Sequence, residues 1–420
     1  MIIKNFKKLA KTDLRRDALT IAEAGYESIA IKKLFRQDLS VDGDTLSVHG
    51  HKYNLKKFDN IYVIGLGKNS AAAAQVIEST IGPRRIQAGF VIDIAKKRMK
   101  KIKAMRGTHP LPSNQNIRAT NKIVELLKNV TEKDLVVAIV CGGGSSLACR
   151  PDSLTCLELQ FISSLLLRAG ATIQEINTVR KHVSLIHGGY LAKEAYPATV
   201  LSLIVSDVPG DDISMVASGP LVPDRTTKSA AERIAKKYGL PPIDFLETPK
   251  DKKYFTRVTN VLIASGSTVV DAMAKKAQEL GYKPIVYSRQ LSGLAKDVGP
   301  AMAKKVKPGQ ALLACGETEV VVTRPGKGGR NQDVVLSAIP NLDTNSVIIS
   351  AASDGKDNVP VAGGIADGTL SAKKIQKRRL DPVVAVNNNR SYKTLHSLRD
   401  HIFIQKITAN ISDFVIVLKK

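Results

Sequence analysis

One pattern recurs along the chain: a short apolar run, then a glycine-rich turn, then a segment of helical character. The apolar runs occupy residues 61–64, 135–140, 201–205, 261–264 and 347–352. Continuous Val, Ile and Leu runs of this length indicate strands buried on both faces of a mainly parallel sheet. Their alternation with helical segments predicts an α/β fold.

Helical periodicity fills several of the intervening stretches. It predicts helices over residues 70–78, 116–127, 157–168 and 269–280, with Gly281 as the glycine that ends the last one. Glycine-rich turns at the carboxyl ends of parallel strands are where open α/β sheets bind ligands. The pattern therefore favours an enzyme over a structural protein.

The domain organisation follows from length and from one weakly organised stretch. A chain of 420 residues suggests two or three domains. Proline, glycine and charge concentrate between residues 228 and 257, which is typical of a boundary. We predict an N-terminal domain over 1–245 and a C-terminal domain over 246–420.

Composition restricts the class of protein. Lys plus Arg is 63 and Asp plus Glu is 38, so the net charge of +25 predicts attraction to anions. The four cysteines lack zinc-site spacing, which favours a reducing compartment. No apolar run approaches the roughly 18–20 residues that cross a bilayer. We expect a soluble cytoplasmic protein without a membrane partner, as a monomer or a homodimer.

The turn after the first apolar run reads Gly65-Leu66-Gly67-Lys68. Glycines let a backbone approach a ligand closely, and a helix N-terminus offers amides to an anion, to which Lys68 adds a charge. Read as a dinucleotide fingerprint, the turn has Ser70 at the third glycine position and Asp93 at the distance of a ribose contact. The alternative is a tight strand–helix turn with a solvated lysine.

A second turn is richer in glycine. The run that follows the strand at 135–140 is Gly142, Gly143, Gly144, Ser145 and Ser146. Three glycines and two hydroxyls at a helix start predict a loop of backbone amides that binds phosphate or carboxylate. It is neither a Walker A loop nor a nucleophile elbow, and close packing alone is the alternative.

Two further segments bring polar groups to the predicted sheet edge. Residues 177–184 contain Asn177, Arg180, Lys181 and His182, which suit either a small anionic substrate or a polar helix face. Asp207 follows the strand at 201–205, where a carboxylate can orient a nucleophile or hold Mg²⁺. A solvated acidic loop is the alternative for Asp207.

The C-terminal half carries its own candidates. Glu317 precedes a glycine-rich, basic segment in which Arg330 and Asn331 follow two glycines. Arg330 can form a bidentate contact with phosphate and stabilise a transferring phosphoryl group. Asp354 follows the last apolar run, and a flexible surface loop is the alternative for residues 326–329.

A basic run at residues 96–106 raises nucleic-acid binding as another hypothesis. Aromatic residues make up only 5% and tryptophan is absent, so surfaces for base stacking are scarce. The run therefore favours a solvated basic face, and no nucleic-acid partner is expected.

Taken in order, these segments resemble the glycerate 2-kinase family of two-domain α/β kinases. The resemblance covers nearly the whole chain. It rests on Gly65-Leu66-Gly67-Lys68, Thr108-His109-Pro110-Leu111-Pro112, Gly142-Gly143-Gly144-Ser145-Ser146, Asn177 to Ser184, Ser206-Asp207-Val208-Pro209-Gly210-Asp211, Ala217-Ser218-Gly219-Pro220, Gly316-Glu317-Thr318, Gly328-Gly329-Arg330-Asn331-Gln332 and Ser353-Asp354-Gly355.

The resemblance implies a Rossmann-like N-terminal domain with a mainly parallel sheet, a smaller α/β C-terminal domain, and an active site in the cleft. It implies ATP with Mg²⁺, D-glycerate as acceptor and 2-phosphoglycerate as product; some archaeal members serve a non-phosphorylative Entner–Doudoroff route. Lys68 and Arg330 stand at the family's catalytic positions.

Together with the resemblance, the turns define one set of expected roles. Lys68, Arg330 and Asp207 are the catalytic candidates, and Asp207 and Asp354 are the metal candidates. The expected ATP-binding residues are Gly65, Gly67, Gly142, Gly143, Gly144, Ser145, Ser146, Glu317 and Asn331.

The chain departs from the family at two places. Ser113 stands where an acid usually follows the His-Pro-Leu-Pro motif, and residues 405–410 keep only Asn410, with Asp413 beyond, of a nucleotide-associated loop. The alternative function is an NAD(P)-dependent hydroxypyruvate reductase, which rests on Gly65, Gly67 and Asp93.

Overall fold

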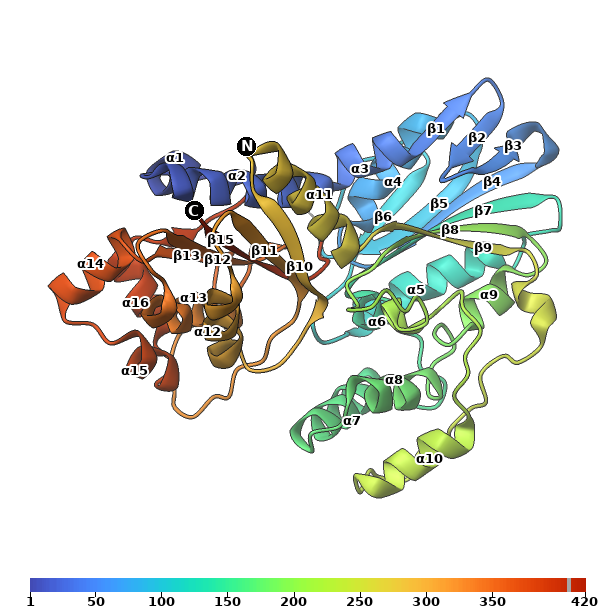
Figure 1. The fold of residues 1–420 in the computed structure, drawn as a ribbon. Helices are drawn as coiled ribbons and strands as arrows, with labels where there is room; N and C mark the ends of the chain where they lie inside the picture. Colours follow the sequence, from blue (N-terminus) through green and yellow to red (C-terminus); the bar gives the residue numbers. More distant parts are fainter. Residues whose placement is uncertain (406–408) are drawn as a thin grey trace. The chain divides into compact units, whose positions relative to one another are not determined.

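The computed structural model describes residues 1–405 and 409–420, which form two compact units (Figure 1). Unit 1 comprises residues 1–33, 209–211 and 264–420, and unit 2 comprises residues 34–208 and 212–263. Residues 406–408 of the divergent loop named above lie outside the described residues.

A six-stranded sheet forms the centre of unit 2. Its strands are β4 (Asn60–Leu66), β5 (Ile86–Asp93), β6 (Ile102–Arg106), β7 (Asp134–Cys141), β8 (Thr199–Val205) and β9 (Val258–Ala264). They lie in the order β6-β5-β4-β7-β8-β9, and β6 to β8 pair in parallel. The predicted parallel sheet is confirmed, and every residue of β7 is buried, as its continuous apolar run predicts.

Helices cover both faces of this sheet. Figure 1 shows α4 on one face and α5 with α9 on the other, where they enclose an apolar core built from alternate residues of β7 and β8. A separate small core joins α7, α8 and α10. The helices are α3 (Ile31–Asp38), α4 (Ser70–Ile81), α5 (Asn114–Leu127), α6 (Gly144–Leu147), α7 (Cys156–Arg168), α8 (Ile173–Lys181), α9 (Tyr190–Ala195) and α10 (Lys228–Lys237), with short 3₁₀ turns η1 (Leu55–Lys57), η2 (Val216–Ser218) and η3 (Lys252–Phe255).

A small antiparallel sheet completes unit 2. It consists of β1 (Leu39–Asp42), β2 (Thr45–Val48) and β3 (His51–Asn54) in sequence order.

The sheet of unit 1 is mixed. Its strands are β10 (Lys283–Leu291), β11 (Gln310–Gly316), β12 (Ser346–Ala352), β13 (Gly363–Asp367), β14 (His401–Ile402) and β15 (Asp413–Lys419). They lie in the order β10-β11-β15-β12-β13-β14. Strands β10 and β11 pair in parallel, whereas β15 is antiparallel to both β11 and β12, and β13 is antiparallel to β12 and β14.

The prediction of a parallel strand at 347–352 is therefore wrong in its pairing. All seven residues of β12 are buried, because helices cover both faces of the sheet. Burial on two faces produces a continuous apolar run whichever direction the neighbours take.

The helices of unit 1 lie on two sides of this sheet (Figure 1). Helices α2 and α11 cover one face, and α12 and α13 pack together against the other. The set is α1 (Phe6–Leu9), α2 (Asp13–Ser28), α11 (Gly266–Glu279), α12 (Ala295–Lys305), α13 (Arg330–Ala338), α14 (Leu370–Arg378), α15 (Pro382–Asn387) and α16 (Ser391–Leu398), with the 3₁₀ turn η4 (Ile339–Asn341).

The N-terminal 33 residues belong to unit 1, which differs from the predicted division at residue 245. Arg15 on α2 is fully buried, pairs with Asp367 and with Asp400 (3.1 Å), and donates to Ser371 Oγ (2.7 Å). A buried guanidinium requires such partners. These partners are more than 350 residues away in sequence, so no local signal predicts the pairing.

Within residues 1–405 and 409–420, no helix combines the length and the apolar character that a membrane span needs.

Candidate functional site

The turns after β4 and β7 meet at the carboxyl edge of the parallel sheet in unit 2. Gly67 has φ of +111°, and a Cβ there would lie 2.3 Å from the carbonyl oxygen of Cys141. The amide of Lys68 donates to the carbonyl of Gly142 at 3.0 Å. Because a side chain at Gly67 would collide with backbone, glycine is required for the two turns to join.

Asp207, which follows β8, packs directly against the second turn. A Cβ at Gly142 would lie 2.4 Å from Asp207 Oδ2, and the same oxygen accepts the amide of Gly143 at 3.2 Å. Gly144 is similarly close to Ala217, whose Cβ would be 2.5 Å from a Cβ at Gly144. The glycines at 142–144 thus serve close packing, and one of their amides is used by Asp207.

Lys68 and His109 both lie over Gly143. A Cβ at Gly143 would be 3.1 Å from the imidazole of His109 and 3.4 Å from Cε of Lys68. The predicted Lys68, Gly143 and Asp207 therefore come together. His109 was not predicted as a site residue, although it lies in the His-Pro-Leu-Pro motif that the sequence analysis quotes.

A hydrogen-bonded network extends from Ser145 on α6 to α8. Ser145 Oγ and Ser218 Oγ are 2.9 Å apart, and Ser218 Oγ donates to Asn177 Oδ1 at 2.7 Å. Arg180 Nη1 donates to the same Asn177 oxygen at 3.0 Å. Burial lowers the pKa of Arg180, and the residues described here include no carboxylate paired with it. Arg180 can therefore bind an anionic ligand. Lys181 of the same segment pairs with Asp224 at 3.1 Å, and His182 Nδ1 lies 2.7 Å from the carbonyl oxygen of Leu246, so these two groups hold the local structure.

Asp93 has a different environment from the one that a ribose contact needs. Its side chain is buried, and it accepts the amides of Ala71 (3.1 Å) and Ile94 (2.6 Å). The carboxylate therefore satisfies the amino end of α4. This arrangement removes the residue on which the dinucleotide interpretation of Gly65 and Gly67 depends.

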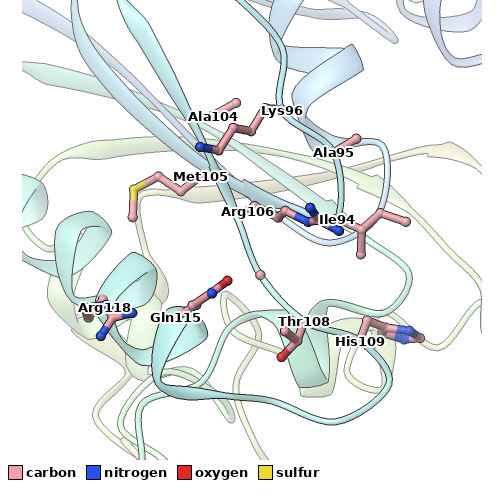
Figure 2. A pocket seen from close by; sticks show the side chains of 11 residues that line it. Ile94, Ala95, Lys96, Ala104, Met105, Arg106, Thr108, His109, Gln115 and Arg118 are labelled. Atoms are coloured by element: carbon pink, nitrogen blue, oxygen red, sulfur yellow. The ribbon is translucent and has the colours of Figure 1, made fainter.

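A basic pocket of about 1250 Å³ opens beside this site, at the ends of β5 and β6 and the start of α5 (Figure 2). Its cations are Lys96, Arg106 and Arg118, and no carboxylate is among the residues that line it. Figure 2 shows His109 and Arg118 on opposite sides of the view. His109 thus borders both the pocket and the turn at Gly143. Two members of the basic run at 96–106 line a cavity, which their sequence pattern did not predict.

Arg330 occupies the first position of α13 in unit 1. Its Nε contacts Asp413 and its Nη1 donates to Glu317 Oε2 at 3.0 Å. Burial raises the pKa of Asp413 to about 6, although the adjacent Arg330 opposes that shift. Two carboxylates from separate strand ends therefore fix the guanidinium, which remains about one-third exposed.

Asn331, by contrast, is inside unit 1. It is 1% exposed, and its Oδ1 accepts from Ser350 Oγ at 2.6 Å while its amide donates to Asp357 at 3.1 Å. Asp357 also accepts the amide of Gln332 at 3.0 Å. These contacts hold the start of α13, so the structure places Asn331 in support of Arg330.

The metal candidates lie in different units, Asp207 in unit 2 and Asp354 in unit 1, where Asp354 accepts the amide of Lys356 at 3.0 Å. No group of three or more His, Cys, Asp or Glu suited to a metal ion occurs among the residues that the structure describes. Mg²⁺ in phosphoryl-transfer enzymes needs only one or two carboxylates beside substrate phosphates. The oxygen chemistry of Asp207 fits that requirement.

The fold and this edge of the sheet define a two-unit α/β protein in which glycine-rich turns pack closely at the carboxyl ends of parallel strands. Two family models match the chain: a domain of unknown function (DUF4147) over residues 17–245 and the MOFRL family over residues 310–413.

Named relatives span most of the chain. A glycerate 2-kinase of Pyrococcus horikoshii is 32% identical, covering 97% of each chain, and a D-glycerate 2-kinase of Thermotoga maritima is 32% identical over 86% of this chain and 91% of its own. A putative hydroxypyruvate reductase of Agrobacterium vitis is 34% identical over 85% of this chain and 98% of its own.

A solved structure gives the same result. The crystal structure of a glycerate kinase from Thermotoga maritima superposes with a TM-score of 0.86 at 30% identity, covering 97% of this chain and 100% of the other. The chain belongs to the glycerate 2-kinase family. The predicted family membership and two-domain α/β fold are confirmed.

Proposed function

We propose that this protein transfers the γ-phosphoryl group of ATP to the 2-hydroxyl of D-glycerate and releases 2-phosphoglycerate. The observation that carries the proposal is the convergence of Lys68, His109 and Asp207 at the turn containing Gly143. Phosphoryl transfer depends on positioning and on charge stabilisation more than on covalent chemistry. A lysine, an imidazole and a carboxylate around closely approaching backbone supply both.

Each group has a distinct proposed role. Lys68 neutralises charge that develops on the transferring phosphoryl group, and Arg330 does the same from unit 1. Asp207 either accepts the proton of the attacking hydroxyl or would hold Mg²⁺ through a carboxylate oxygen; the metal, when bound, would supply positive charge to the phosphates. Asp354 is the second proposed carboxylate for the metal.

The proposed nucleotide contacts divide between the units. In unit 2, the turns at Gly65, Gly67 and 142–146 bring backbone close to the phosphates. The three cations of the 1250 Å³ pocket suit the polyphosphate, since the cavity exceeds the size of a typical small-molecule site. In unit 1, Glu317 and Asn331 support the segment that carries Arg330.

The direct test is a product analysis. The protein is incubated with ATP, Mg²⁺ and D-glycerate, and the product is identified by phosphorus NMR. A 2-phosphoglycerate resonance is expected. A 3-phosphoglycerate resonance would retain the kinase and overturn the proposed acceptor hydroxyl, and no phosphoester at all would overturn the function. Consumption of NADH with hydroxypyruvate, measured in parallel, would favour the reductase instead.

Arg180 provides a separate prediction about substrate binding. We expect Arg180→Gln to raise the KM for D-glycerate roughly 10- to 100-fold with a much smaller change in kcat, because one charge-assisted hydrogen bond to the carboxylate is lost. Steady-state kinetics at saturating ATP measures both constants.

The matched control for this prediction is Arg168→Gln, which removes an exposed arginine from α7. It should leave both constants unchanged. An Arg180→Gln enzyme whose KM for glycerate equals that of the control would contradict the assignment.

A further inference from the structure

A second basic pocket, of about 570 Å³, lies in unit 1 between α1 and the segment from α16 to β14. Its cations are Lys7, Lys8, Lys11 and Arg399, all exposed. No carboxylate is among the residues that line it. The volume is that of a small-molecule site.

The charge of this pocket is not neutralised by neighbouring acids. Asp400 follows Arg399 in sequence, but its buried carboxylate pairs with Arg15 (3.1 Å) and Lys374 (2.8 Å). In the part of the chain that the structure describes, none of the four lining cations pairs with a carboxylate. Clustered like charges repel one another, so a bound anion relieves that repulsion.

The two walls of the pocket are joined by backbone and amide hydrogen bonds. Asn5 Nδ2 donates to the carbonyl of His401 (2.8 Å), and Asn5 Oδ1 accepts the amide of Phe403 (3.1 Å). The amide of Lys4 donates to the carbonyl of Phe403 at 2.8 Å. The lysines of α1 therefore project from a backbone that is fixed against β14.

Aromatic rings complete the lining. His401 stacks on Tyr392 with ring centroids 4.8 Å apart, and Phe403 is 40% exposed at the pocket. A cluster of cations beside a partly exposed ring suits a phosphate ester whose organic part covers the ring.

We propose that this pocket binds a small phosphorylated molecule, and that its occupancy stabilises the start of α13, where Arg330 lies. The site is separate from the residues assigned to phosphoryl transfer. Any effect of this ligand on phosphoryl transfer through Arg330 rests on the proposed function. Binding of the ligand and stabilisation of the start of α13 do not depend on it.

A short chain of hydrogen bonds connects the pocket to α13. His401 Nε2 lies 3.1 Å from Gln332 Oε1, and Gln332 Nε2 donates to Asp357 Oδ2 at 2.9 Å. Asp357 in turn accepts the amides of Asn331 and Gln332. Gln332 donates to Asp357 through Nε2, so its other side-chain atom, Oε1, is the one that faces His401. Because Oε1 can only accept a hydrogen bond, His401 must donate from Nε2. A ligand that contacts His401 is therefore linked through Gln332 and Asp357 to Asn331, the residue next to Arg330, and should hold this chain of hydrogen bonds more firmly.

The binding test uses inorganic pyrophosphate as the probe and lysine acetylation, read by mass spectrometry, as the measurement. On the full-length protein at low ionic strength, pyrophosphate should slow acetylation of Lys7, Lys8 and Lys11 several-fold. Exposed Lys304 and Lys307 in the same unit should react at an unchanged rate. Site-resolved labelling separates this pocket from any pyrophosphate bound elsewhere.

A charge-reversal variant provides the matched control. In Lys7→Glu/Lys11→Glu, Lys8 remains as the reporter, and the pyrophosphate concentration that half-protects it should rise at least roughly tenfold. Lys304→Glu/Lys307→Glu changes the net charge equally and should leave that concentration unchanged. Adenosine monophosphate and ribose 5-phosphate, compared in the same assay, distinguish a nucleotide from a sugar phosphate as the source.

Hydrogen exchange tests the response of α13. Pyrophosphate should slow amide exchange across residues 329–333 in the native protein and in the Lys304→Glu/Lys307→Glu control, and to a clearly smaller extent in Lys7→Glu/Lys11→Glu. Equal protection of all five lysines, or none, overturns the site. Protection of the pocket lysines with exchange at 329–333 unchanged overturns the coupling.

Discussion

Replacing Lys68 with alanine should lower kcat by roughly 100-fold or more, as removal of one preorganised charge-stabilising group does in other enzymes. Lys68 lies over Gly143, with its Cε 3.4 Å from the position of a Cβ there, and the amide of Lys68 is fixed by the carbonyl of Gly142. The backbone of this turn is determined by Gly67, so the substitution removes the charge and leaves the turn in place.

The measurement is the rate of ADP formation at saturating ATP and D-glycerate, with the fold checked by circular dichroism. Lys52→Ala, at an exposed lysine on β3 of the same unit, is the control and should retain full activity. A folded Lys68→Ala enzyme with the kcat of the control would remove Lys68 from the catalytic residues.

Replacing Arg330 with alanine should have two large effects. We expect kcat to fall roughly 100-fold or more, for the same reason as at Lys68. We also expect the free energy of unfolding to fall by about 1–3 kcal/mol, because the buried carboxyl of Asp413 loses its hydrogen-bond partner.

The two effects can be separated by a second substitution. Arg330→Ala/Asp413→Asn removes the unpaired charge, so it should recover most of the stability in urea unfolding without recovering kcat. Arg378→Ala, at an exposed arginine of α14, is the control and should change neither quantity. If the double variant regained activity together with stability, the role of Arg330 would be structural.

The strands of the parallel sheet could be predicted from sequence because a strand that is buried on both faces has a continuous run of apolar residues. The apolar runs at 61–64, 135–140 and 201–205 correspond to β4, β7 and β8, and each strand is two or three residues longer than its run. The same pattern at 347–352 correctly predicted a strand, but that strand, β12, pairs antiparallel with β15 and not in parallel. Burial does not depend on the direction of neighbouring strands, so an apolar run does not predict that direction.

The candidate site was predictable where chemistry and backbone geometry coincide in a short segment. Gly67, Gly143 and Asp207 stand at strand ends in sequence, and the sheet brings them into contact. His109 was missed because it follows no apolar run of the predicted kind. Asn331 has an amide side chain typical of binding sites, yet its hydrogen bond to Ser350 depends on a strand partner that no local pattern specifies.

The division into units was the least predictable feature. A composition signal near residue 245 marks a surface-exposed, polar stretch, whereas the actual division depends on where α2 packs. Arg15 fixes the packing of α2 through its buried contacts with Asp367, Ser371 and Asp400. No local sequence pattern predicts these contacts, because the partners lie more than 350 residues away.

This arrangement imposes an order on biosynthesis. Residues 34–263 contain all of unit 2, so that unit can complete its contacts while the ribosome is still translating the remainder. Unit 1 cannot, because β15 (Asp413–Lys419) lies between β11 and β12 in its sheet. Arg15 and Asp400 are 385 residues apart, so at roughly 5–20 residues per second the nascent α2 waits about 20–80 s for its partner. The apolar face of α2 can pack on α11 earlier, once residue 279 has been translated, but Arg15 has no carboxylate partner until Asp367 and Asp400 follow. A ribosome that stalls before residue 413 leaves unit 1 without the strand that joins β11 to β12.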